Sequence, residues 1–158
     1  MMATIDHPVR IEPGTSDDLE AVMDVMEAAF GTQFGEAWTR SQCAGILPMA
    51  GVSLMLARDG NGAAGFSLFR SVAGEAELLL LAVAPSHRRR GIGRGLLSNF
   101  LERARALGVS RVHLEVRDGN PAIEMYRAAG FSPIGRRRNY YHAQDGHQFD
   151  ALTFALDL

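Results

Sequence analysis

The residues with the clearest chemical potential follow an apolar stretch in the middle of the chain. Three arginines, Arg88 to Arg90, precede a closely spaced pair of glycines, Gly91 and Gly93, and a helical pattern follows. Glycine lets backbone N–H groups approach a phosphate without obstruction by a Cβ atom, and arginine adds positive charge there. This order predicts a loop that binds a phosphate-bearing ligand at the start of a helix. The alternative is a solvated basic turn.

The spacing of these glycines argues against two common kinds of nucleotide site. A nucleoside triphosphate site of the P-loop type needs G-x-x-x-x-G-K-[ST], which this segment does not contain. A dinucleotide site needs G-x-G-x-x-G in an N-terminal strand–helix–strand unit, whereas these glycines lie past residue 90. We therefore expect neither kind of site.

The chain offers little for metal or cysteine chemistry. Cys43 is its single cysteine, so an internal disulfide and a cysteine-based metal site are both excluded. Cys43 is interpreted as a small buried apolar residue rather than a nucleophile. His142 and His147 lie five positions apart without a matching carboxylate pattern, so we expect no bound metal.

The composition fits one folded domain. The 158 residues are 47% hydrophobic with a formal net charge of −2, which predicts a single domain over 1–158 and argues against a dedicated nucleic-acid binder. The first ten residues lack the apolar region of a signal peptide, and the longest apolar run, 78–85, is too short to span a bilayer. We expect a cytoplasmic protein.

The elements that must hold the basic loop alternate between strands and helices. Thr15 and Asp18 form a capping box that predicts a helix start, and Asp59-Gly60-Asn61-Gly62 predicts a hairpin. The expected helices cover 15–30, 39–47, 93–107 and 120–130, and the expected strands cover 9–11, 52–57, 64–70, 77–84, 111–117, 131–137 and 149–156. We predict an α/β domain around one mixed sheet of about seven strands, in the order β-α-α-β-β-β-α-β-α-β-β.

Three of these segments have informative patterns. The strand at 77–84 is almost wholly apolar, as expected for a strand buried on both faces. The strand at 111–117 alternates, which places Glu115 on its polar face. The helix at 93–107 has one apolar stripe that is expected to face the core, formed by Leu96, Leu97, Phe100, Leu101, Ala104 and Leu107.

The basic loop and the helix after Asn120 resemble the GNAT superfamily of N-acetyltransferases. Arg88-x-x-Gly91-x-Gly93 after a Val-x-Pro strand end is similar to motif A, which binds the pyrophosphate of coenzyme A in that superfamily. Met125-Tyr126 and Ala129-Gly130-Phe131 are similar to its following signature. The resemblance implies a GNAT fold, acetyl-CoA as cosubstrate and coenzyme contacts at Leu81, Ala82 and Val83 (through the backbone), at Arg88, Arg89, Arg90, Gly91, Ile92, Gly93 and Arg94, and at Asn120.

Further stretches resemble one subgroup, the bacterial ribosomal-protein-alanine N-acetyltransferases of RimI type. They are Leu114-Glu115-Val116-Arg117, Arg137-Arg138-Asn139-Tyr140-Tyr141, Asp145-Gly146 and Phe34-Gly35-Glu36-Ala37-Trp38-Thr39, where Ala37 replaces the group's proline. The resemblance implies that Glu115 is the general base and Tyr126 the general acid. Trp38, Tyr140 and Tyr141 are the expected acceptor-binding residues. One residue fewer than usual separates Asn120 from Ala122, which leaves the contact of Asn120 open.

Each of these residues also has a purely structural interpretation. Glu115 could simply pair with Arg117 or with a neighbouring strand. Tyr126 could be an aromatic at the edge of the core with its hydroxyl satisfied, and Asn120 could be only a helix cap. Trp38 could be a lid over the core.

Three functions remain open at this stage. The first is acetylation of a protein N-terminus, as on a ribosomal protein, and the second is acetylation of a small amine such as a polyamine, amino acid or antibiotic; one site chemistry serves both. The third is a module that senses coenzyme A or binds RNA through the basic patches 87–90 and 136–138. Oligomeric state is not predicted, and neither a membrane nor nucleic acid is expected as a partner.

Overall fold

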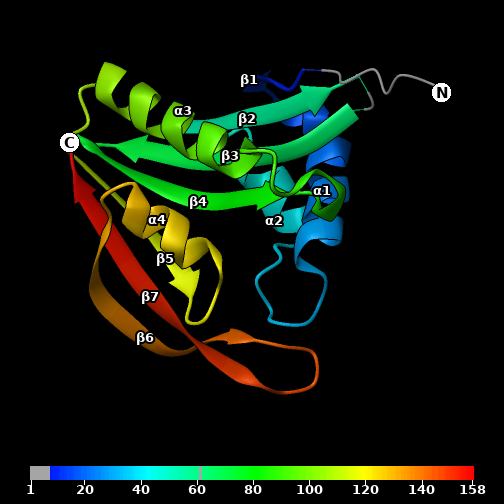
Figure 1. Ribbon diagram of the computed structural model, residues 1–158, viewed down its shortest axis with the longest axis vertical. Coiled ribbons are helices and arrows are strands. Elements are labelled where there is room, and N and C mark those ends of the chain that lie inside the picture. Colours follow the sequence, from blue (N-terminus) through cyan, green and yellow to red (C-terminus); the bar gives the residue numbers. More distant parts are fainter. Residues whose placement is uncertain (1–7, 61) are drawn as a thin grey trace.

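The computed structural model describes residues 8–60 and 62–158, and its centre is one mixed sheet (Figure 1). The strands of the described part pair in the order β1-β2-β3-β4-β5-β7-β6. Their bounds are Arg10–Gly14 for β1, Val52–Asp59 for β2, Gly62–Val72 for β3, Glu75–Val83 for β4, Arg111–Arg117 for β5, Ser132–His142 for β6 and Gln148–Asp157 for β7. Only β4 and β5 pair in parallel among these strands; the other neighbours are antiparallel. The predicted fold class and element order are confirmed.

Four helices cover the two faces of the sheet. They are α1 (Leu19–Phe30), α2 (Arg40–Ile46), α3 (Ile92–Ala106) and α4 (Ala122–Ala128) among the described residues. In the view of Figure 1, α3 and α4 lie in front of the sheet, whereas α1 and α2 lie behind it. The predicted capping box at Thr15 and Asp18 is present before α1, and a second one at Thr39 and Gln42 opens α2.

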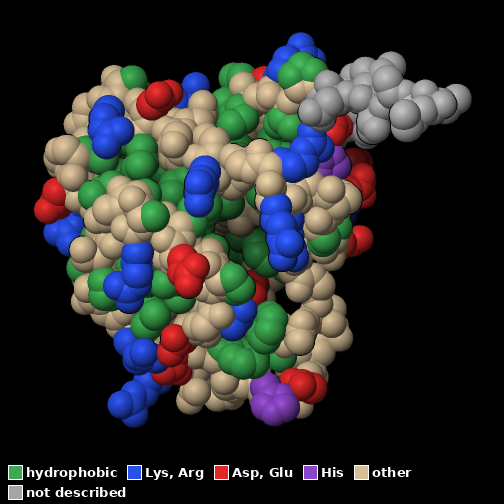
Figure 2. Space-filling view, in the orientation of Figure 1, with side chains coloured by type: hydrophobic (Ala, Val, Ile, Leu, Met, Phe, Trp, Pro, Cys, Tyr) green, Lys and Arg blue, Asp and Glu red, His purple; other side chains and the backbone are tan. Residues whose placement is uncertain are grey.

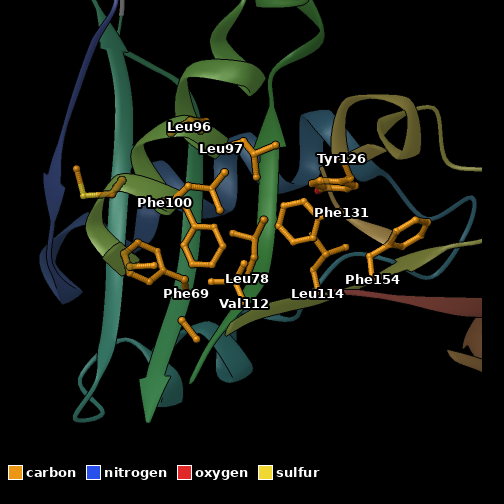
Figure 3. Close-up of a cluster of buried hydrophobic side chains, with 14 of the residues drawn as sticks. Phe69, Leu78, Leu96, Leu97, Phe100, Val112, Leu114, Tyr126, Phe131 and Phe154 are labelled. Atoms are coloured by element: carbon orange, nitrogen blue, oxygen red, sulfur yellow. The ribbon is translucent and has the colours of Figure 1, made fainter. Parts of the chain in front are cut away.

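Each face of the sheet has its own hydrophobic core. The core under α3 and α4 contains Phe69, Phe100 and Phe131, and Figure 3 shows these side chains with Tyr126 at one end. The other core packs α1 and α2 against β2, β3 and β4 through Val22, Met26 and similar side chains. Both cores are therefore anchored on the central strands, where the basic loop begins.

A β-bulge in β4 lets this strand contribute to both cores. Leu68 pairs with Leu80 while Phe69 pairs with Leu78, so Leu79 is an extra residue in β4. Residues two apart in a regular strand share a face, but here Leu78 belongs to the α3/α4 core and Leu80 to the α1/α2 core. The predicted burial of this strand on both faces is confirmed.

The same part of β4 separates from β5. Their parallel pairing runs from Glu75 opposite Arg111 to Leu78 opposite Leu114. Both strands continue beyond this point, β4 to Val83 and β5 to Arg117. The diverging ends leave a wedge in the sheet, and the candidate site lies in that wedge.

The structure corrects several details of the sequence prediction. Leu107 was expected in the apolar stripe of the helix but is 63% exposed, because α3 ends at Ala106 and the chain turns at Gly108. The first strand continues through Pro13 and Gly14, since their pairing with β2 persists. The strand β6 extends to His142 because β7 continues to pair with it.

Some sequence expectations lie partly outside the described residues. Asn61 of the predicted hairpin is one of them, as are residues 1–7, which formed most of the segment considered for a signal peptide. None of the helices in the described ranges is long and apolar enough to cross a membrane.

Candidate active site

The basic loop and the start of α3 form one wall of a cleft of about 800 Å³. The backbone of β4, the helix α4 and the loop after α1 supply the other walls. Figure 2 looks onto this face, which is hollowed near its centre with basic side chains along the hollow. The sequence-predicted coenzyme residues that line the cleft are Leu81, Ala82, Val83, Arg88, Arg89, Gly91, Ile92, Gly93, Arg94 and Asn120.

The basic loop turns sharply just before α3. Arg89 and Gly91 have positive φ angles of 65° and 77°, so the chain curls just before α3 begins at Ile92. The first N–H groups of a helix have no partner within the helix, and they carry the positive end of its dipole. The glycines and the arginines that line the cleft are therefore suited to a pyrophosphate such as that of coenzyme A.

Two side chains of the loop, Arg90 and His87, interact with Asp59 at the end of β2. Arg90 is outside the cleft lining, with Nη1 3.9 Å from Oδ2 of Asp59. His87 lies 2.7 Å from the same carboxylate through Nε2, although it also borders the cleft. The prediction that Arg90 contacts coenzyme is thus not supported by its position, because its charge is directed toward the end of β2.

A second, smaller cavity of about 160 Å³ opens in the wedge between β4 and β5. The two catalytic candidates and the three acceptor-binding candidates all line it: Trp38, Glu115, Tyr126, Tyr140 and Tyr141. These residues come from the loop before α2, from β5, from α4 and from β6. The structure therefore brings together five residues that are up to 103 positions apart in the chain.

Tyr126 lies where the two cavities meet. It lines both of them and is 6% exposed, with its ring edge-on to Phe131 at 6.0 Å between centroids. Burial, and secondarily the charge of Glu36, raise the pKa of the Tyr126 phenol above its ordinary value. The phenol therefore stays protonated at neutral pH and can donate a hydrogen bond or a proton toward either cavity. The structural interpretation as a core-edge aromatic also holds.

Glu115 faces the small cavity and is paired across the sheet. Its Oε1 lies 2.8 Å from Nε of Arg137 on β6, and its side chain is 15% exposed. Burial, and after it the charge of the nearby Glu115 carboxylate, raises the pKa of the Tyr140 phenol. The partner is thus Arg137 rather than the Arg117 considered from the sequence, because Arg117 is occupied elsewhere.

Two site residues were missed by the sequence analysis. Glu36 lines both cavities, with Oε1 3.1 Å from Nε of Arg117 and Oε2 2.8 Å from Nδ2 of Asn120. Arg117, itself 7% exposed, lies 3.7 Å above the Phe34 ring. The signal in the sequence was that Glu36 and Arg117 both belong to stretches matched to the RimI group, and that Arg117 ends an otherwise alternating strand.

Asn120 and Trp38 each contribute to the fold and also line a cavity. Asn120 accepts a hydrogen bond from the Ala122 N–H at 2.8 Å, which confirms the expected cap at the start of α4, while its amide donates to Glu36. Trp38 packs against the α1/α2 core and lines the small cavity. Within the described part of the chain, no group of three or more His, Cys, Asp or Glu side chains could hold a metal ion.

Comparisons with known proteins point in the same direction as this geometry. The profile of the Acetyltransferase (GNAT) family matches residues 19–131. The [Ribosomal protein bS18]-alanine N-acetyltransferase of Escherichia coli K12 is 38% identical over 108 residues, which cover 68% of this chain and 72% of the relative. The N-alpha-acetyltransferase RimI of Mycobacterium tuberculosis is 43% identical over 98 residues, covering 61% of this chain and 58% of that protein.

A solved structure extends the likeness to nearly the whole chain. The ribosomal-protein-S18-alanine N-acetyltransferase from Escherichia coli superimposes with a TM-score of 0.86 at 30% identity, over 95% of this chain and 94% of that one. A family profile that spans most of the chain and a relative at 38% identity show the family. This chain belongs to the GNAT family of N-acetyltransferases, enzymes that use acetyl-CoA as cosubstrate.

Proposed function

We propose that the protein acetylates the N-terminal α-amine of another protein, such as a ribosomal protein. The observation that carries the proposal is the pair of cavities that meet at Tyr126, one suited to coenzyme and one, of about 160 Å³, suited to a small amine. The named activity of the relatives supports the same class of acceptor. We further propose that the protein works in the cytoplasm.

The chemistry is direct attack of the amine on the acetyl thioester. An α-ammonium group has a pKa near 8, against about 10.4 for lysine, so a modest base suffices to free the attacking nitrogen. Glu115 takes this proton, directly or through a water molecule. The nitrogen then bonds to the acetyl carbon, the carbon–sulfur bond breaks with its electron pair going to sulfur, and the nitrogen loses its remaining excess proton to water.

The backbone and Tyr126 stabilise the charge that develops. An N–H group of β4 near Val83, on the strand that has separated from β5, is suited to the thioester oxygen as it becomes negative. Tyr126 supplies a hydrogen bond or a proton to the departing thiolate. Its raised phenol pKa keeps the hydroxyl protonated at neutral pH, which suits the hydrogen bond better than full proton transfer.

The size of the acceptor cavity favours a small first residue. Trp38, Tyr140 and Tyr141 enclose it with ring surfaces, and Glu36, Glu77 and Glu115 supply carboxylates. A volume of about 160 Å³ leaves little room for a large side chain beside the amine. We therefore expect N-terminal Ala, Ser and Gly to be accepted better than bulky residues.

A small cationic amine is the second candidate, because three carboxylates border the same cavity.

The RNA-binding alternative has weaker support. Arg136 is paired with Asp118 and Asp150 at 2.8 Å each, and Arg137 is paired with Glu115. Much of the positive charge at 136–138 is therefore already neutralised, and a filter-binding titration with RNA at moderate salt is expected to show no specific retention.

A panel assay tests the acceptor assignment. Peptides that begin with Ala, Ser, Met or Gly are compared with internal-lysine peptides of blocked N-terminus and with spermidine. We expect turnover of the free N-termini with small first residues. Turnover of spermidine alone would favour the second candidate instead.

A further inference from the structure

Glu36 occupies a position that the reaction described above does not use. Its carboxylate borders both cavities, yet it comes from the loop between α1 and α2 rather than from the sheet. Its side chain is only 12% exposed. Burial of a charged carboxylate is unfavourable unless hydrogen bonds or a cation compensate it. The contacts of Glu36 therefore show what holds it at the junction of the two cavities.

The carboxylate is held in place by two donors. Nε of Arg117 lies 3.1 Å from Oε1, and Nδ2 of Asn120 lies 2.8 Å from Oε2. A carboxylate offers about four lone-pair positions, so these two contacts leave acceptor capacity on both oxygens. The remaining capacity is available to a cation that enters either cavity.

Arg117 is itself fixed, which makes it a rigid support. Its guanidinium lies 3.7 Å above the Phe34 ring and 5.7 Å from the Phe149 ring, and Nη1 donates to the Asp118 carbonyl at 3.1 Å. Phe34 and Phe149 also contact each other edge-on at 5.3 Å between centroids. The loop that carries Glu36 is thus clamped to β5 and β7, and Glu36 has little freedom to leave the junction.

The negative charge of Glu36 reaches the working part of the site. It contributes, after burial, to the raised pKa values of the Tyr126 and Tyr141 phenols. Both tyrosines line the small cavity. The field of Glu36 therefore extends into the space where an acceptor must bind.

We propose that Glu36, positioned by Arg117 and Asn120, binds the ammonium form of the acceptor before Glu115 removes its proton. The inference deepens the proposed function and rests on it only in requiring an amine acceptor. It separates two tasks between two carboxylates: Glu36 sets the affinity for the charged amine and Glu115 sets the rate of proton transfer. Arg117 is a positioning residue that acts through Glu36.

The first test compares steady-state constants of variants. Glu36→Gln keeps the shape but removes the charge, so the acceptor KM is expected to rise at least tenfold while kcat changes less than about threefold. The affinity for acetyl-CoA, measured by calorimetry, shows separately how far the substitution affects the coenzyme cleft, which Glu36 also borders. Glu27→Gln, an exposed residue of α1, is the control for loss of one negative charge.

A double variant separates ammonium binding from a merely structural ion pair. Glu36→Gln alone leaves a buried guanidinium without its counter-charge, which can disturb the loop or the fold. Glu36→Gln with Arg117→Met removes both charges and keeps an apolar chain over Phe34. If Glu36 only neutralises Arg117, the double variant regains the wild-type acceptor KM, which overturns the proposal. If Glu36 binds the ammonium group, the KM stays raised.

The pH dependence of the acceptor KM distinguishes ammonium binding from a purely structural role of Glu36. The variant-to-wild-type KM ratio should fall between pH 7 and 9, as the α-ammonium group, with a pKa near 8, loses the charge that Glu36 attracts. Arg117 stays charged, and the raised phenol pKa values keep Tyr126 and Tyr141 neutral over this range. The other charged neighbours, Glu115 with Arg137 and Glu77 with His113, are common to both enzymes. A ratio that is constant with pH contradicts the proposal.

The test of Glu36 can succeed or fail independently of which amine proves to be the acceptor. The variants are assayed with whichever amine the wild-type enzyme acetylates fastest in the panel of N-terminal peptides, lysine peptides and spermidine. A wild-type preference for spermidine refutes the proposed acceptor but leaves the Glu36 test intact, with the pH range moved to that amine. Wild-type KM in Glu36→Gln refutes the role of Glu36 whatever the acceptor is.

Discussion

At the scale of single residues, the proposed chemistry assigns different roles to Tyr126 and Glu115, whose surroundings differ. Tyr126 is buried near a negative charge, which favours its protonated form, and Glu115 faces the acceptor cavity from a polar strand face. The proposed acid and the proposed base are thus different side chains from different elements. The two roles can therefore be tested one residue at a time.

Tyr126→Phe removes the hydroxyl and keeps the ring against Phe131. We expect kcat to fall by on the order of 10² or more with coenzyme affinity nearly unchanged, because the departing thiolate loses its proton donor. Steady-state kinetics and calorimetry measure the two effects. A kcat within about threefold of wild type would mean that Tyr126 is structural.

Glu115→Gln keeps an oxygen near Arg137 but removes the basic carboxylate. Near pH 7 the rate on a free N-terminus is expected to fall by on the order of 10²–10⁴. The defect should shrink as pH rises through about 8, because the α-amine then loses its proton without help. A Gln variant that matches wild type at pH 7 would exclude Glu115 as the base.

At the scale of elements, two loops border the site, and each contains a glycine with a positive φ angle. The loop before α3 turns at Gly91, and the loop between α1 and α2 touches β6 at Gly35. Both glycines have positive φ angles, 77° and 71°, which side chains tolerate poorly. Substitution of Gly91 is expected to weaken coenzyme binding, whereas substitution of Gly35 is expected to weaken acceptor binding.

Gly91→Val should weaken acetyl-CoA binding at least tenfold, about 1.4 kcal/mol or more. Valine is strained at this φ, so the loop that lines the cleft must change its conformation to accept it. Calorimetry on the folded variant measures the loss. Unchanged affinity would mean that the loop does not bind the coenzyme.

Gly35→Ala should raise the acceptor KM more than it weakens coenzyme binding. An added Cβ would lie 2.1 Å from the carbonyl oxygen of His142, so the loop that carries Glu36 and Trp38 must move away from β6. Gly31→Ala is the matched control, because Gly31 also has a positive φ, 56°, but nothing within 4 Å of a Cβ. Equal effects of the two substitutions would contradict this role of the Gly35 contact.

Local patterns explain why most elements were predictable. Capping boxes, alternating strands and glycine stops act within a few residues, so the order of elements and the basic loop could be read from the sequence. The bulge at Leu79 could not, because it depends on the pairing of β4 with β3. The pairs Glu36–Arg117 and Glu115–Arg137 join residues 81 and 22 positions apart, and they exist only because the sheet order brings those elements together.

At the scale of the whole molecule, the separation of β4 from β5 opens the sheet where the two cavities lie. The strands pair as far as Leu78 and Leu114 and then separate, and the two cavities for which we propose coenzyme and acceptor lie beside this opening. The helices on both faces hold the sheet around this opening (Figure 1). The central claim is that the amine entering from the acceptor side is a protein N-terminus.

A single pair of peptides tests this claim most directly. One has a free N-terminal alanine and no lysine; the other has the same sequence with a blocked N-terminus and one internal lysine. We predict that acetyl transfer, followed by mass spectrometry at neutral pH, modifies the first peptide rapidly and the second at least on the order of tenfold more slowly, because the lysine amine is almost fully protonated. Rapid acetylation of the lysine peptide with no modification of the free N-terminus would contradict the account.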